Sequence, residues 1–440
     1  MRAAILVVLL ATTMAATLPT HTNSSSDEWP TFHGNWARTG YTNTSLPEEL
    51  KLLWKFNVGF AVLTIKSSPA VANGKVFFTA ENMENGPSYG LLHIYALDAE
   101  NGSLVWSYRA GRDAGAGLHP SPTVVGGRVY VGDWDYLYAF DAENGDLIWR
   151  FEDVPPYPTL NGVDGAPVVV GNRVYVGSWN GYMYSLSITD GSLIWKKYVP
   201  GHIMESPAVV DGIIYFGTGA GGENTTGEVY ALNAENGSVV WKFYIGDEIG
   251  TSPAVVDNIV YIGAGFMGHL PGDGMYALNA QTGALIWKFS RGENPVESSP
   301  AVYNGKVYFG CYDGNIYALN AENGDVVWSR PTGGWVWSSP VVADGKVYIG
   351  YLDGRFYVLD AEDGSYIQHM SVDRTISSTP AIAYGKLYFA SSDTLYAYGT
   401  PAREIESTKP YLPVAIGIAL IVLAGALLWR LLSIRGLKRR

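Results

Sequence analysis

A single cysteine, Cys311, is present among the 440 residues of the chain. With one thiol no internal disulfide can form, so the fold must be stabilised by packing. Basic residues are also scarce, since 29 Lys and Arg stand against 41 Asp and Glu and give a net charge of −12. The sequence contains no clustered basic face, so nucleic acid is not an expected partner.

Charged residues of either sign make up only 16% of the chain, whereas 52 Gly, 30 Tyr and 14 Trp are present. Aromatic residues favour strands and Gly favours tight turns. This composition therefore predicts an all-β fold built from many short strands rather than from helices.

Both ends of the chain carry uncharged segments. An apolar run follows Arg2, which predicts a signal peptide over residues 1–23. Residues 410–429 contain no charge and, as a helix rising about 1.5 Å per residue, would cross the roughly 30 Å hydrocarbon core. We therefore expect a linker at 402–409, a transmembrane helix at 410–432 and a basic tail at 433–440. The positive-inside rule places the tail in the cytoplasm, so this is a single-pass protein of the cell membrane with an extracellular part at 24–401. Five Asn-x-Ser/Thr sequons would permit glycosylation: Asn23, Asn43, Asn101, Asn224 and Asn236.

Two short patterns alternate at a regular spacing between the termini. The first reads DAENGSLVW at 98–106 and NAENGDVVW at 320–328, with further copies between them. The second is a proline that follows a Ser, Ala or Thr, repeated at spacings of 40 to 53 residues. These prolines are Pro69, Pro122, Pro167, Pro207, Pro253, Pro300, Pro340 and Pro380. A repeat of this length is typical of propeller blades, so eight prolines predict an eight-bladed β-propeller.

Each repeat divides into four strands separated by turn residues. In the sixth repeat the strands are expected at 299–302, 306–310, 315–320 and 325–329. Because proline cannot donate to a ladder, the repeated prolines are expected on the innermost strand, whose free edge lines the central channel. The eighth repeat lacks a fourth strand, and residues 52–59 align with the outer strand of the first repeat. We expect this N-terminal strand to close the ring.

The segment 277–287 reads Ala-x-Asn-x-x-Thr-Gly-x-x-x-Trp and resembles the tryptophan-docking motif of the PQQ-repeat propellers, named after pyrroloquinoline quinone. This family includes quinoprotein alcohol dehydrogenases and the outer-membrane assembly factor BamB. The segment 29–41 is also similar to the opening of many such proteins. The resemblance implies that one tryptophan per blade stacks between neighbouring blades. These residues are Trp54, Trp106, Trp149, Trp195, Trp241, Trp287 and Trp328.

Ligands of propellers bind at the channel mouth, where the loops that depart most from the repeat come together. The candidate binding residues on these loops are Arg112, His119, Asp133, Trp134, Trp179, His202, Glu205, Glu297, Trp335, Trp337 and Arg374. The sequence has no Cys/His spacing of a zinc site, and we predict neither a metal site nor a catalytic residue.

Two functions remain open. The first is a non-catalytic binding or assembly scaffold, without a cofactor, for an extracellular or envelope protein or a glycan. The alternative implied by the resemblance is a dehydrogenase of alcohols or sugars, with PQQ stacked on Trp335 or Trp337 and calcium as Lewis acid. Catalytic members of the family typically cover the cofactor with a disulfide between adjacent cysteines, which one cysteine cannot form. The sequence therefore favours the scaffold, whose C-terminal helix replaces the N-terminal lipid anchor of the assembly-factor branch.

Overall fold

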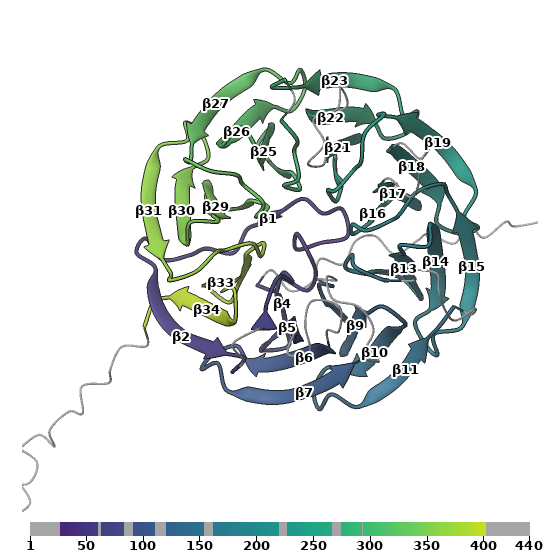
Figure 1. Cartoon of the computed structure of the whole chain (residues 1–440), viewed down its shortest axis with the longest axis horizontal. Helices are drawn as coiled ribbons and strands as arrows, with labels where there is room; N and C mark the ends of the chain where they lie inside the picture. The colour runs from purple at the N-terminus through teal and green to yellow at the C-terminus, as the bar shows by residue number, and fades with distance from the viewer. Residues whose placement is uncertain are drawn as a thin grey trace, which may run out of the picture. The chain divides into compact units, whose positions relative to one another are not determined.

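Eight four-stranded sheets are arranged around a central axis in a computed structural model of the chain (Figure 1). The structure describes residues 27–59, 63–82, 91–110, 120–153, 162–219, 227–265, 274–292 and 294–401. The predicted all-β, eight-bladed propeller is therefore confirmed. Within these ranges no helix is long and apolar enough to cross a membrane. The predicted signal peptide, linker, transmembrane helix and cytoplasmic tail lie outside the described residues.

The blades follow one another in chain order, each from the innermost strand outward. Blades 1 to 4 contain β4 (Ala70–Ala72), β5 (Lys75–Asn82), β6 (Leu91–Asp98) and β7 (Leu104–Ala110); β8 (Thr123–Val125), β9 (Arg128–Gly132), β10 (Leu137–Asp141) and β11 (Leu147–Phe151); β12 (Val168–Val170), β13 (Arg173–Gly177), β14 (Tyr182–Ser187) and β15 (Leu193–Tyr198); β16 (Ala208–Val210), β17 (Ile213–Gly217), β18 (Glu228–Asn233) and β19 (Val239–Tyr244). Blades 5 to 8 contain β20 (Ala254–Val256), β21 (Ile259–Ala264), β22 (Gly274–Asn279) and β23 (Leu285–Phe289); β24 (Ala301–Tyr303), β25 (Lys306–Gly310), β26 (Asn315–Asn320) and β27 (Val326–Pro331); β28 (Val341–Ala343), β29 (Lys346–Gly350), β30 (Arg355–Asp360) and β31 (Tyr366–Ser371); β32 (Ala381–Ala383), β33 (Lys386–Ser391), β34 (Thr394–Gly399) and β2 (Lys51–Asn57). Two short strands are added to this frame, β3 (Leu63–Thr64) beside β5 and β1 (Tyr41–Thr42) beside β28.

The N-terminal strand closes the ring as expected. Strand β2 pairs with β34 in antiparallel register, from Lys51 opposite Gly399 to Asn57 opposite Thr394. Residues more than 300 positions apart in the sequence thus share one blade, and the outer edge of β34 is paired rather than exposed.

The innermost strands are shorter than predicted. In blade 6 the first strand begins at Ala301, so Pro300 precedes it instead of lying within it. The same holds in the other blades, because each repeated proline stands directly before its innermost strand. A proline there fixes the backbone where the chain enters the blade without removing a donor from the ladder.

One tryptophan joins the blade to the next in seven of the eight blades. In blade 1 the Trp106 indole Nε1–H donates to the Ala142 carbonyl oxygen of blade 2 at 3.2 Å. Gly145 of blade 2 lies over the Trp106 ring, and a Cβ added to this glycine would come within 2.6 Å of the ring atom Cδ2. Equivalent bonds to the next blade are made by Trp54, Trp149, Trp195, Trp241, Trp287 and Trp328. Blade 7 has Gln368 at this position, and its amide bonds the backbone of Leu50 instead.

The inner edges are not free, which corrects the prediction of a channel lined by unpaired strands. The N-terminal segment 27–40 follows the inside of the ring and offers its carbonyl groups to the innermost strands. For example, the backbone N–H of Val209 donates to the Trp36 carbonyl oxygen at 2.8 Å. The other N–H donors of this kind are Val71, Val124, Val255, Val302, Val342 and Tyr384. The segment therefore satisfies inner-edge donors in seven of the eight blades.

Arg38 holds this segment in place. Its side chain is fully buried, and the guanidinium donates to the carbonyl oxygens of Phe32, Ala166 and Pro207 and to the Thr31 hydroxyl. Burial lowers the pKa of Arg38 to about 9. Because its donors are matched by oxygen acceptors, the buried cation fixes the segment against blades 3 and 4.

Candidate functional site

A five-residue pattern before each innermost strand builds the central site. It begins with an aliphatic residue, which in six of the seven described copies packs on a glycine of the preceding blade. Val336, for instance, fills the space beside Gly310, where an added Cβ would lie 2.2 Å from Val336 Cγ1. The aliphatic residue is buried in every described copy. Because the aliphatic side chain points away from the axis and is buried against the preceding blade, the next residue faces the axis of the ring.

Small hydroxyl residues frame the site immediately before the repeated prolines. The backbone N–H of Ser252 donates to the Ser299 hydroxyl, and that of Ser299 donates to the Ser339 hydroxyl, each at 2.9 Å. The same bond joins Ser68 to Ser121, Ala166 to Ser206, Ser206 to Ser252 and Ser339 to Thr379. This series of bonds links neighbouring blades around the axis and makes the frame rigid.

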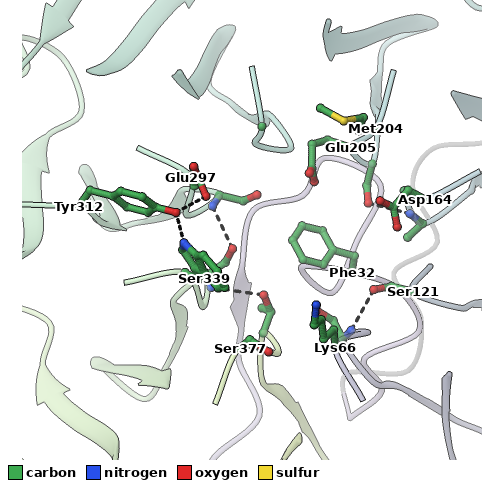
Figure 2. Close-up of a pocket in the computed structure, with 18 residues that line it drawn as sticks. Phe32, Lys66, Ser121, Asp164, Met204, Glu205, Glu297, Tyr312, Ser339 and Ser377 are labelled. Atoms are coloured by element: carbon green, nitrogen blue, oxygen red, sulfur yellow. Dashed lines mark hydrogen bonds between the residues drawn. The ribbon is translucent and has the colours of Figure 1, made fainter. Parts of the chain in front are cut away.

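A cavity of about 410 Å³ lies inside this frame. The axis-facing residues of the pattern line it, one from each blade that the structure describes there: Lys66, Asp164, Met204, Gly250, Glu297, Trp337 and Ser377. Phe32 of the N-terminal segment, Glu205 of blade 4 and Tyr312 of blade 6 also line it (Figure 2). The frame is repetitive, but the side chains facing the cavity differ from blade to blade. This volume is in the range of small-molecule sites.

Glu297 is the first of two perturbed carboxyl groups in the cavity. Its Oε2 accepts a hydrogen bond from the Tyr312 hydroxyl at 2.5 Å, and the Trp337 indole N–H donates to the same hydroxyl. The Oε1 atom is buried and has no hydrogen-bond partner among the described residues. Burial raises the pKa of Glu297 to about 7, the Tyr312 bond opposes this rise, and the charge of Glu248 adds to it.

Glu205 is the second perturbed carboxyl group. Burial, together with the charges of Asp164 and Glu297, raises its pKa to about 8, and a bond from the Ser252 hydroxyl at 3.4 Å acts in the opposite direction. In five other blades this position holds Ser or Thr, whose hydroxyl bonds the second strand of its own blade, as Ser378 bonds Ala390. Glu205 has no hydroxyl for this bond, and its carboxyl group faces the cavity (Figure 2).

Three of the predicted binding residues, Glu205, Glu297 and Trp337, line the cavity. Trp335 lies beside it and stacks on Tyr312, with ring centroids 5.2 Å apart. Trp134, Trp179 and His202 form a separate aromatic cluster with centroid distances of 5.9 and 5.2 Å. This cluster is not part of the cavity lining.

Two further candidates, Asp133 and Arg374, are also absent from the cavity lining. Asp133 is buried in a turn, where its carboxylate accepts hydrogen bonds from the backbone of Asp135 and Tyr136 and from the Tyr138 hydroxyl. Burial raises the pKa of Asp133 to about 6. Arg374 is exposed and lies 4.0 Å from an Asp393 carboxylate oxygen. Arg112 and His119 are outside the described residues.

Sequence reasoning missed Phe32, Lys66, Met204 and Tyr312. The signal for Lys66 and Met204 is present, because both occupy the second position of the pattern that precedes each proline. Aligning the repeats on that pattern would have grouped them with Glu297 and Trp337. Phe32 had no such signal, since nothing in the repeat indicates that the N-terminal segment enters the channel.

The described lining does not suit PQQ with calcium. Within the described ranges no group of three or more His, Cys, Asp and Glu side chains could hold a metal ion. Three carboxyl groups and one lysine are the ionisable acidic and basic residues described in the lining. PQQ is a tricarboxylate, which any ionised carboxyl group of the lining would repel. The Cys311 thiol is buried, 3.7 Å from the Pro295 carbonyl oxygen, and burial raises its pKa to about 12.

Comparisons with known proteins agree with this fold. The family model described as outer membrane protein assembly factor BamB matches residues 47–221. A search of curated proteins finds no significant match in sequence. A europium-containing methanol dehydrogenase superposes with a TM-score of 0.71 at 15% identity, over 86% of this chain and 99% of its own. BamB from Moraxella catarrhalis superposes with a TM-score of 0.62 at 17% identity, over 80% of this chain and 100% of its own. Quinohemoprotein alcohol dehydrogenase from Comamonas testosteroni superposes with a TM-score of 0.70 at 15% identity, over 86% of this chain and 81% of its own. The resemblance predicted from the repeats is thus confirmed: residues 47–221 match the BamB family model, and the propeller is similar in fold to the quinoprotein dehydrogenases and to BamB.

Proposed function

We propose that this protein is a non-catalytic binding propeller that presents one face of its ring to a partner outside the cell. The partner is an extracellular or envelope protein or a glycan. The similarity to BamB supports protein binding in general, and the acidic composition argues against nucleic acid.

One observation carries the proposal. Trp337 at the cavity and Trp335 beside it remain 39% and 50% exposed among the described residues. Tryptophan side chains that stay accessible at a concave surface are typical anchors of protein interfaces and also stack on sugar rings. Both indoles contact Tyr312, so they are fixed in place before a partner arrives.

The membrane anchor belongs to the same proposal. With a helix at 410–432 and a cytoplasmic tail, the ring would stay at the cell surface, where a soluble scaffold would be lost by diffusion. A tether also raises the effective concentration of the propeller toward partners in the same membrane.

Cross-linking in the native membrane tests the proposal. The unmodified protein should capture a defined partner, and a variant carrying Trp335→Ala and Trp337→Ala should capture much less while keeping the same melting temperature. Tyr244→Ala is the matched control, because Tyr244 is an exposed aromatic residue on an outermost strand, away from the cavity lining. Equal capture by all three proteins would contradict the proposal.

A dehydrogenase remains the second candidate because two of the similar structures are dehydrogenases. Trp337 could then stack a quinone. The acidic lining and the single cysteine argue against it, and no catalytic step is assigned to these residues.

A further inference from the structure

We propose that the central cavity binds a small organic cation, with its ammonium group between the carboxyl groups of Glu205 and Glu297. This inference rests on the proposed function, since it names the ligand class of the same cavity. It is based on the residues that line the cavity, the position of its charged groups and the Glu297 carboxylate oxygen that accepts no hydrogen bond from the described residues.

The carboxyl groups are not required by the fold. Glu205 occupies a position at which other blades use Ser or Thr to bond their own second strand. Glu297 leaves Oε1 buried without a partner among the described residues. A buried carboxylate oxygen without a hydrogen-bond donor is unfavourable. A ligand that brings N–H donors to this place would remove that penalty.

The charges around the two groups also favour a cation. Glu205 faces Asp164 from blade 3 and Glu297 from blade 6, and Glu297 in turn faces Glu248 and the Tyr312 hydroxyl. Lys66 of blade 1 is the only basic residue of the described lining. In Figure 2, Lys66 lies on the other side of Phe32 from Glu205 and Glu297. The carboxyl groups repel one another when ionised, which is why a cation between them is stabilised.

An organic cation fits better than a metal ion. The described residues include no group of three or more His, Cys, Asp and Glu that could ligate one. The lining instead combines the carboxyl groups with Phe32, Met204 and Trp337. Aromatic faces attract ammonium groups, and the methylene stem of an alkylamine can pack on the apolar side chains. A volume of about 410 Å³ admits a small molecule of this kind.

Binding of a cation must be coupled to proton release. The raised pKa values of Glu205 and Glu297 mean that both groups hold protons near neutral pH. An ammonium ion favours their ionised forms, so affinity should rise with pH by up to about tenfold per unit for each proton released, until these groups are ionised. Alkylamines remain protonated up to a pH of about 10, so the ligand itself does not titrate in this window.

Calorimetry on the full chain in detergent tests the inference, with 1,4-diaminobutane as the probe and uncharged 1,4-butanediol as its control. The diamine should bind and the diol should not, and the affinity should rise at least about tenfold between pH 6 and pH 8. Heats measured in buffers of different ionisation enthalpy should reveal released protons. Glu205→Gln and Glu297→Gln should each lower the affinity at least about tenfold, as expected for the loss of a charged hydrogen bond. Glu322→Gln, in the exposed turn between β26 and β27, should not change it.

Equal binding of diamine and diol, or an affinity independent of pH, would overturn the inference on the unmodified protein alone. Unchanged affinity in both folded Gln variants would do the same. Failure of the cation-binding inference can be distinguished from failure of the proposed function, because partner capture through Trp335 and Trp337 does not require diamine binding. A lysine-containing peptide added as competitor distinguishes a free amine from a partner side chain as the natural source of the cation.

Discussion

The junction between blades 1 and 2 gives a quantitative prediction about the origin of stability. Gly145 has φ +78°, and an added Cβ would lie 2.6 Å from Trp106 Cδ2. Gly145→Ala should therefore be destabilising for two reasons. The left-handed conformation costs about 1–2 kcal/mol for a residue with a Cβ, and overpacking against the indole adds about 1–3 kcal/mol.

Gly74→Ala is the matched control. Gly74 has φ +69°, but its added Cβ would meet no atom within 4 Å. This substitution should show the backbone penalty alone, about 1–2 kcal/mol. Removing the ring by Trp106→Ala should bring the penalty of Gly145→Ala down to the same value, so the double-mutant cycle should give a coupling of about 1–3 kcal/mol.

Urea unfolding followed by far-UV circular dichroism measures these differences without relying on the fluorescence of the mutated tryptophan. Equal losses of unfolding free energy for Gly74→Ala and Gly145→Ala would refute the argument. So would a penalty of Gly145→Ala that is unchanged in the Trp106→Ala background. Either result would mean that the tryptophan and glycine do not pack as a unit.

Three further predictions concern closure, topology and pH. Deleting residues 24–59 removes the partner of β34 and the carbonyl groups that line the channel, so the melting temperature should fall sharply; an unchanged melting curve would show that closure is not needed. Protease added to intact cells should digest the ring and leave a fragment containing 410–440, whereas digestion of an epitope placed after Arg440 would reverse the orientation. Glu205 and Glu297 have pKa values raised above those of the unfolded chain, so the folded state holds more protons and stability should fall as pH rises from about 5 to 8. Glu205→Gln should flatten that fall in melting curves recorded across this range, and a steeper fall would contradict the assignment.

The sequence predicted the frame of the molecule well because the frame repeats. The eight prolines set the number of blades, and the copies of the docking motif place a tryptophan at seven junctions. The closing strand could also be found, since 52–59 matches an outer strand that the last repeat lacks. In each case a local pattern recurs often enough to separate it from chance.

The site was predicted only in part, because it depends on contacts that do not repeat. Glu205 and Glu297 were predicted because they lie on loops that depart from the repeat. Asp133 was predicted on the same ground, but its carboxylate is hydrogen-bonded within a turn. The N-terminal segment occurs only once in the sequence, so no repeat predicts its path through the channel. The buried guanidinium of Arg38 holds the segment on this path. Only the folded ring brings Phe32 beside Glu205.

Incubation of the purified full chain with PQQ and calcium tests the central claim that this propeller binds without catalysing. After removal of free cofactor, the account predicts no stoichiometric retention of PQQ and no dye-linked oxidation of alcohols or sugars above a buffer control. Retention of one PQQ per chain, lost in the Trp335→Ala and Trp337→Ala variant and accompanied by turnover, would contradict it and assign the protein to the dehydrogenases.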